Sequence, residues 1–109
     1  MSITINIYYT GEKVGDAAAF AEEMEQSGIA DRVRAEEGNL RYEYYLPLGD
    51  RNTVLLIDSW KDQAALDLHH ASPMMRKIAA LREKYDLHMR VERYVGDDRE
   101  TNDGRFIRE

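Results

Sequence analysis

One segment, residues 38–60, constrains the fold of this chain more than any other, because it predicts a β-hairpin. Gly38-Asn39 indicates a turn, and the apolar or aromatic residues that follow alternate with mostly charged ones, as in a strand with one buried face. A loop that contains Pro47 comes next, and residues 53–60 predict the partner strand. The Val-Leu-Leu-Ile run in this second strand indicates burial on both of its faces.

Periodic segments on either side of the hairpin predict the remaining elements. The predicted order is a strand over residues 2–9, helical segments over 17–24 and 29–35, the hairpin, helices over 62–68 and 73–85, and a strand over 87–92. Two helix starts have local signals. Asp62 is a good N-cap, and Ser72 is predicted to cap a helix whose first residue is Pro73.

The order βαββαβ predicts a ferredoxin-like α+β fold, in which helices cover one face of a four-stranded sheet. The other face carries Tyr8 and Tyr45 beside charged and apolar residues, so we expect it to pair with a second sheet in a symmetric homodimer. Residues 1–95 form the predicted domain. Residues 96–109 are charged and poor in apolar side chains, which indicates a mobile tail or an arm laid on a partner.

Charge and composition exclude several classes of function. The formal net charge is −6, whereas a nucleic-acid-binding protein needs a clustered basic face. No apolar run is long enough to span a bilayer and no signal peptide opens the chain, so we expect no membrane partner and a cytoplasmic location. The chain has no cysteine, which excludes a disulfide, a thiolate nucleophile and a Cys-ligated metal.

Three short motifs in a fixed order resemble a known family. They are Glu-Gly-Asn-Leu-Arg-Tyr at residues 37–42, Asp-Ser-Trp-Lys-Asp at 58–62 and His-His-Ala-Ser-Pro at 69–73. With these motifs, most of residues 1–95 resembles the antibiotic biosynthesis monooxygenase superfamily of dimeric α/β barrels, which includes quinol monooxygenases, haem-degrading enzymes and an isomerase of a phosphorylated sugar signal. The chain departs from the usual pattern at Asp58, where Glu is usual, and at Met74, where many members have His.

The resemblance implies oxygenation of a quinol or phenol without a metal, flavin or other cofactor. Such a reaction needs a dry pocket, a base that makes the substrate anion, and donors that hold the oxyanion. His69 is the predicted base, because an unperturbed imidazole pKa of about 6.5 suits proton abstraction near neutrality; the competing interpretation is a partly exposed residue near a helix end. Asn6 is the second predicted catalytic residue, since amides at this place in the family orient substrate or oxygen. Haem binding is not expected, because the helix position that ligates iron in haem-degrading members falls near Ala79.

Four further residues are predicted to bind the substrate. Trp60 offers a stacking surface, although a single Trp at a strand end is more often a core residue. Tyr42 and Tyr44 share a strand face, where a phenol can donate to an oxyanion or serve only for packing. Met74 is predicted as a soft pocket wall or as core. His70 is predicted on the surface, because it points about 100° away from its neighbour on the helix.

The sequence therefore predicts a homodimeric, cofactor-independent monooxygenase that acts on a small aromatic such as a quinol, with molecular oxygen as second substrate. Two alternatives stay open. The first is an isomerase of a small phosphorylated ketose-like signal, in which the same histidine transfers protons and Arg41 or Arg90 holds the phosphate. The second is a binding module that uses the same pocket without turnover.

Overall fold

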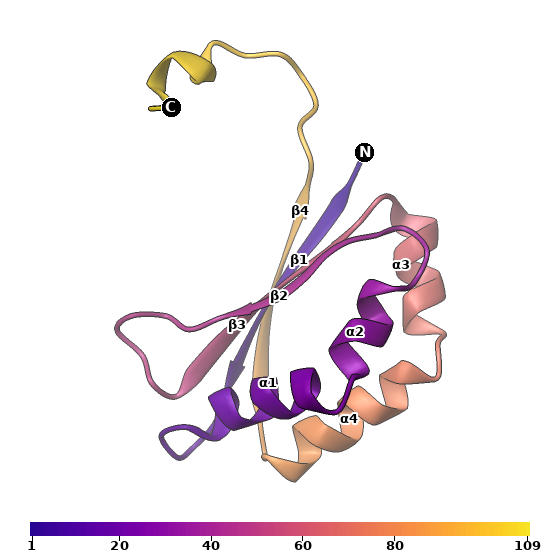
Figure 1. Ribbon diagram of the computed structural model, residues 1–109, viewed down its shortest axis with the longest axis vertical. Coiled ribbons are helices and arrows are strands. Elements are labelled where there is room, and N and C mark those ends of the chain that lie inside the picture. Colours follow the sequence, from indigo (N-terminus) through magenta and orange to yellow (C-terminus); the bar gives the residue numbers. More distant parts are fainter.

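The computed structural model describes all 109 residues of the chain (Figure 1). Its elements are, in order, β1 (Ile3–Thr10), α1 (Asp16–Gln26), α2 (Ile29–Arg34), β2 (Asn39–Tyr45), β3 (Thr53–Trp60), α3 (Gln63–His70), α4 (Met74–Lys84), β4 (His88–Val95) and a short 3₁₀ helix, η1 (Asp103–Phe106). The predicted order of strands and helices is confirmed. The bounds of β3 agree with the prediction, and those of the other elements differ by a few residues.

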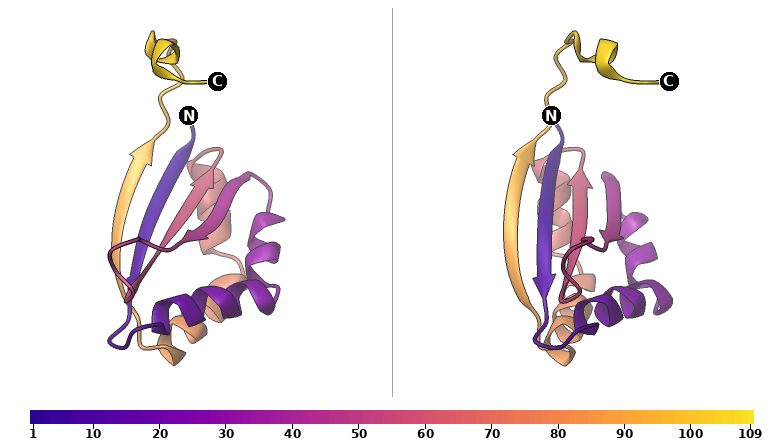
Figure 2. Two further views of the ribbon diagram at one scale, coloured as in Figure 1. Left: turned by 60° about the vertical axis from the view of Figure 1, so that its left-hand side comes forward. Right: turned by 90° about the vertical axis from the view of Figure 1, so that its left-hand side faces the viewer.

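The four strands form one antiparallel sheet in the order β2-β3-β1-β4. All four α-helices lie on one side of this sheet, as the two views of Figure 2 show. The chain therefore has the predicted ferredoxin-like α+β fold, with the first and third strands in the middle and β2 and β4 at the edges.

Alternation along the strands divides the sheet into a covered face, which lies under the helices, and an open face. On β1 the covered face carries Ile3, Ile5, Ile7 and Tyr9, and the open face carries Thr4, Asn6 and Tyr8. The register places Ile5 between Asp58 of β3 and Arg93 of β4, so these three residues cross the sheet in one row.

The hydrophobic core fills the space between the covered face and the helices. Phe20 of α1 is at its centre, with ring contacts to Tyr9 (4.9 Å between centroids), Tyr44 and Tyr85. The predicted burial of the Val-Leu-Leu-Ile run of β3 on both faces is complete only on the covered face, at Val54 and Leu56. Leu55 and Ile57 on the open face are half-buried in the single chain.

The turn before β2 sets the position of α3. Gly38 has a left-handed φ of 85°, and a Cβ at this residue would lie 2.6 Å from the Cβ of Ala65 in α3. Its carbonyl accepts a hydrogen bond from the amide of Lys61 at 2.8 Å. Because only glycine allows this close approach, the loop before β2, with Glu36, lies directly against α3.

The two helix starts predicted from sequence have different outcomes. Asp62 caps α3 as predicted, since its carboxylate accepts a hydrogen bond from the amide of Ala65 at 2.8 Å. The prediction for Ser72 is wrong, because Pro73 occupies the N-cap position of α4 and no side chain caps the helix. The chain passes from α3 to α4 through one tight turn, and the Ser72 hydroxyl is buried there without a partner.

Residues 96–109 leave the end of β4 and extend away from the packed domain (Figures 1 and 2). Within this tail, Phe106 and Ile107 are exposed. None of the helices in the chain has the length and apolar composition needed to cross a bilayer.

Candidate active site

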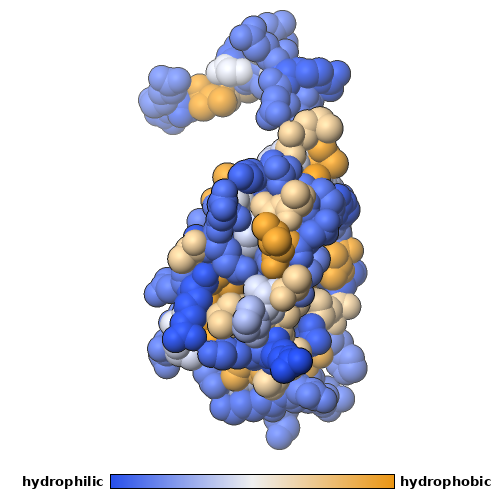
Figure 3. All heavy atoms as spheres, turned by 90° about the vertical axis from the view of Figure 1, so that its right-hand side faces the viewer, coloured by the Kyte–Doolittle hydropathy of each residue, from blue (hydrophilic) through white to orange (hydrophobic).

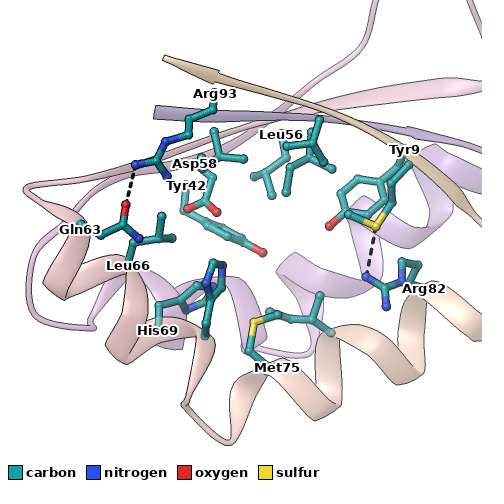
Figure 4. A pocket seen from close by; sticks show the side chains of 16 residues that line it. Tyr9, Tyr42, Leu56, Asp58, Gln63, Leu66, His69, Met75, Arg82 and Arg93 are labelled. Atoms are coloured by element: carbon teal, nitrogen blue, oxygen red, sulfur yellow. Dashed lines mark hydrogen bonds between the residues drawn. The ribbon is translucent and has the colours of Figure 1, made fainter. Parts of the chain in front are cut away.

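A cavity of about 270 Å³ lies between the covered face of the sheet and helices α3 and α4 (Figure 4). From the side on which the helices lie, apolar side chains gather in the middle of a largely hydrophilic surface (Figure 3). Ten of the 16 residues that line the cavity are hydrophobic. The other six are Asp58, Gln63, His69, His70, Arg82 and Arg93, and two of the ten hydrophobic residues, Tyr9 and Tyr42, carry hydroxyls.

His69 lies in the last turn of α3, and its side chain is buried at the wall of the cavity. Its Nδ1 is 2.8 Å from Oε2 of Glu36, which comes from the loop before β2. The interpretation of His69 as a partly exposed helix residue is therefore wrong, because the turn at Gly38 brings the chain over this end of α3. A carboxylate only accepts hydrogen bonds, so Nδ1 is the donor of this pair; in the neutral imidazole, Nε2 then has the lone pair.

Trp60 holds both the imidazole and a neighbouring carboxylate in place. Its ring stacks on that of His69, with 4.6 Å between centroids and 25° between planes, and its Nε1 donates to Oδ1 of Asp58 at 2.6 Å. Trp60 is completely buried and does not line the cavity, which confirms its core interpretation. In the single chain, Trp60 therefore supports residues that do line the cavity.

Asp58 is a cavity residue that the sequence analysis did not propose for the site. Only 4% of its surface is exposed, and burial raises the pKa of its carboxyl to about 6, while the Trp60 hydrogen bond and the nearby His69 oppose this shift. The signal was present in the alternation of β3, where a carboxylate shares its face with Val54, Leu56 and Trp60. A carboxylate on a face that is otherwise apolar is unusual enough to indicate a site.

The two predicted tyrosines have different environments. Tyr42 is buried and lines the cavity, whereas Tyr44 packs edge-on against Phe20 and does not reach it. The hydroxyls of the two are 3.4 Å apart, with Tyr44 donating to Tyr42. Burial raises the pKa of both phenols well above the usual value, so both stay protonated near neutral pH.

Two other predicted residues lie outside the cavity. Asn6 is on the open face of β1, so the sheet separates it from His69 within one subunit. Its Oδ1 is buried and has no hydrogen-bond partner. Met74 packs against the core, and the neighbouring Met75 of α4 lines the cavity in its place. Helix α4 starts at Met74, and with this start Met75 rather than Met74 lies on the side of the helix that lines the cavity.

His70 lines the cavity although its side chain is exposed, and its ring centroid is 5.8 Å from that of His69. The predicted surface position of His70 is confirmed, but the residue also lines the cavity. As the last residue of α3, it lies at the mouth of the cavity.

The arginines proposed for phosphate binding do not reach the cavity. Arg41 pairs with Glu43 on the open face, and Arg90 lies over the ring of Tyr8, 4.0 Å from its centroid. Arg41 is on the edge strand β2 and Arg90 on the edge strand β4. Both side chains lie on the open face, and the residues next to them in sequence lie on the covered face. The arginines that do line the cavity are Arg82 of α4 and Arg93 of β4, which the sequence analysis did not propose as site residues.

A sequence model of the family described as antibiotic biosynthesis monooxygenase matches residues 2–81, well over half of the chain. The chain belongs to the antibiotic biosynthesis monooxygenase family. This confirms the family that the three motifs predicted. Those motifs bring together Trp60, Asp58 and His69, which are in direct contact or linked by one hydrogen bond.

Several known proteins are similar to this chain in sequence or in fold. The protein named "Putative monooxygenase YcnE" from Bacillus subtilis (strain 168) is 37% identical over 56 residues, which cover 51% of this chain and 59% of that protein. The chain thus spans less than two thirds of the length of this curated relative.

Two solved structures show the likeness in fold. SnoaB, a cofactor-independent oxygenase from Streptomyces nogalater, has a TM-score of 0.72 at 18% identity, covering 93% of this chain and 96% of that one. A conserved protein from Methanosarcina mazei Go1 has a TM-score of 0.71 at 21% identity, covering 86% and 91%.

Proposed function

We propose that the chain is a cofactor-independent monooxygenase that oxygenates a small phenol or quinol inside the cavity between the sheet and helices α3 and α4. The observation that carries this proposal is the buried His69, which contacts Glu36 on one side and the apolar cavity on the other. SnoaB, which shares the fold, is a cofactor-independent oxygenase, and this supports the reaction type.

In this proposal His69 is the general base. With Nδ1 donating to Glu36, the lone pair on Nε2 accepts the proton of a substrate hydroxyl. The positive charge that develops on the imidazole then lies next to the carboxylate of Glu36. Glu36 has the role of the third residue of a catalytic triad, which orients the histidine. Glu36 is a positioning residue, since it acts through His69.

The overall reaction needs no external reductant. A quinol and one molecule of oxygen give a hydroxyquinone and one molecule of water, so one oxygen atom enters the ring and the other leaves as water. The quinol itself supplies the electrons. The protein has to form the anion, exclude bulk water and stabilise negative charge on oxygen, and the apolar walls and the Tyr42 hydroxyl suit the last two tasks.

The isomerase of a phosphorylated ketose remains a second candidate, because Arg82 and Arg93 line the cavity and guanidinium groups bind phosphate well. The same His69 would then move a proton beside the substrate carbonyl. This reaction consumes no oxygen, so a direct measurement separates the two.

We also propose that two copies of the chain pair through their open sheet faces. Tyr8 and the half-buried Leu55 and Ile57 lie on this face without a cover in the single chain. A stable homodimer would bury more than about 1,000 Å² in total.

Oxygen consumption tests the proposed function. Metal-free protein is mixed with a panel of reduced benzoquinones and naphthoquinones, and oxygen uptake is followed against the uncatalysed rate. Uptake that scales with protein concentration and yields the hydroxyquinone supports the monooxygenase. No uptake with any quinol contradicts it, and isomerisation of phosphorylated ketoses is then assayed before the chain is classed as a binding module.

A further inference from the structure

The two arginines of the cavity both bond to neutral groups. Arg93 donates to the amide oxygen of Gln63, and Arg82 donates to the sulfur of Met89 at 3.1 Å (Figure 4). Thioether sulfur is a weak acceptor, so the guanidinium of Arg82 keeps most of its hydrogen-bonding capacity.

Elsewhere in the chain, arginines with side-chain partners are neutralised by acids. The pairs are Arg34 with Glu25 and Asp31, Arg41 with Glu43, Arg90 with Glu92, and Arg99 with Asp97. The remaining five arginines are exposed on the surface, where water solvates them. Arg82 differs from both groups, because it is half-buried beside an apolar cavity and has no carboxylate partner.

Tyr9 provides a second, independent sign of a ligand at this end of the cavity. Only 2% of its surface is exposed, its hydroxyl has no hydrogen-bond partner in the protein, and Figure 4 shows this hydroxyl pointing into the cavity. Burial raises the pKa of Tyr9 to about 12, although the positive charge of Arg82 lowers it, so the phenol is a hydrogen-bond donor at neutral pH.

The sheet register separates this end from the proposed reaction centre. Arg93 is in the row of Asp58, whereas Met89, the partner of Arg82, is opposite Tyr9. Four residues along β4 correspond to about 13 Å, so Tyr9 and Met89, the partner of Arg82, lie at one end of the cavity, and Asp58 and Arg93 lie at the other.

We infer that the Arg82 guanidinium and the Tyr9 hydroxyl form an anion subsite, which recognises a carboxylate or phosphate monoester on the substrate at the end opposite to its reacting hydroxyl. The position of the reacting hydroxyl rests on the proposed function, whereas the subsite itself does not. A cavity of about 270 Å³ is near the lower limit of small-molecule sites, which start at roughly 300 Å³. The substrate body is therefore one ring or two fused rings.

The test measures binding without turnover. Isothermal titration under argon compares 1,4-dihydroxynaphthalene-6-carboxylate, its methyl ester and the 6-phosphate monoester. Wild type should bind the carboxylate or the phosphate at least roughly tenfold more tightly than the neutral ester, as expected for a charge-assisted hydrogen bond. The tighter of the two anions identifies the natural group.

Four variants locate the effect. Arg82→Gln should reduce the preference for the anion to within about twofold, and Tyr9→Phe should reduce it roughly threefold while keeping the packing on Phe20. Arg76→Gln is the matched control, because Arg76 is exposed on the same helix and does not line the cavity. Thermal melting confirms that each variant is folded, and Arg82→Lys, which keeps the charge, should keep most of the preference.

Equal binding of anion and ester by wild type would overturn the subsite, as would an equal loss of preference in Arg76→Gln. Oxygen uptake with neutral quinols, together with no preference for anions, would support the proposed monooxygenase and contradict the anion subsite. A preference for anions that depends on Arg82, without oxygen uptake, would support the subsite and contradict the proposed oxygenation.

Discussion

The two faces of the sheet are built from alternate residues of the same strands, yet their polar groups have opposite environments. On the open face, polar groups pair with one another: the hydroxyls of Thr4 and Ser59 are 2.8 Å apart, and those of Thr10 and Thr53 are 3.0 Å apart. On the covered face, the Tyr9 hydroxyl has no partner, and the buried Asp58 has a raised pKa.

This difference shows what each face is suited for. Polar groups that hydrogen-bond to one another contribute to packing and to the specific pairing of surfaces. Buried polar groups with unused hydrogen-bonding capacity lower the stability of the fold unless a ligand bonds to them. The covered face is therefore the site of the proposed chemistry, and the open face the site of the proposed assembly. Asn6 is the exception on the open face, since its Oδ1 is buried and unpaired.

The largest expected effect is at His69. Replacing the proposed base in His69→Gln should lower kcat/KM for the true substrate by roughly 10²–10⁴-fold. Since the ring is buried and stacks on Trp60, the variant should also lose about 1–3 kcal/mol of stability, more than a partly exposed histidine would. Oxygen-uptake kinetics and thermal melting measure the two effects.

His70→Ala is the control for His69, because His70 is exposed at the cavity mouth and should change kcat/KM only severalfold. Equal rates for wild type and His69→Gln would remove His69 from the mechanism. A loss of activity that matches the fraction unfolded would be an effect on folding only.

The second prediction concerns assembly through the open face. Ile57→Glu places a charge beside Asn6 in the middle of this face and should weaken the proposed dimer by more than roughly 100-fold, because an unpaired buried charge is strongly unfavourable. Sedimentation velocity at micromolar concentration should then show a monomer, whereas Leu68→Glu on the exposed side of α3 should leave the dimer intact. A wild-type monomer under the same conditions would contradict the homodimer itself.

The third prediction is a pH dependence at Asp58. Its folded-state pKa of about 6 lies above the ordinary value of 3.8, so between these values the native state binds more protons than the unfolded state. The contribution of Asp58 to the unfolding free energy therefore falls as pH rises from about 4 to about 6 and is constant above. Asp58→Asn should be more stable than wild type by roughly 1–3 kcal/mol at pH 7 and about equal to it at pH 4.

Urea unfolding at both pH values, with activity assayed in parallel, checks this prediction. A gain in stability at pH 7 together with slower turnover would show that the carboxylate is retained for function. A stability difference that does not change with pH would mean that Asp58 has the same pKa in the folded and unfolded states.

The smallest expected effect is at Asn6. Because the sheet separates it from the cavity of its own subunit, Asn6→Ala should leave kcat/KM within about twofold and weaken the proposed dimer only severalfold. Kinetics at saturating protein concentration, where the dimer persists, measure the first effect alone. A loss of 10²-fold or more in kcat/KM under those conditions would restore Asn6 to the reaction and show that the two faces act together.

The sequence alone determined the order of the elements, the bounds of β3, the cap at Asp62 and the family, because these depend on local periodicity, on capping and on three short motifs. It also selected His69 as the candidate base, and the structure places this residue at the cavity wall. The prediction of a cap by Ser72 was wrong, because the tight turn between α3 and α4 depends on how the two helices pack.

Only the tertiary structure decided which side chains meet. A period of two shows that Ile5, Ile7 and Tyr9 share a face, but it does not show which face the helices cover, so only the placement of the helices shows that Asn6 lies on the open face. Glu36 lies in a loop without a periodic pattern and meets His69 across 33 residues of sequence. Arg82 comes from α4 and Tyr9 from β1, and their convergence on one cavity is a long-range consequence of packing that no local pattern encodes.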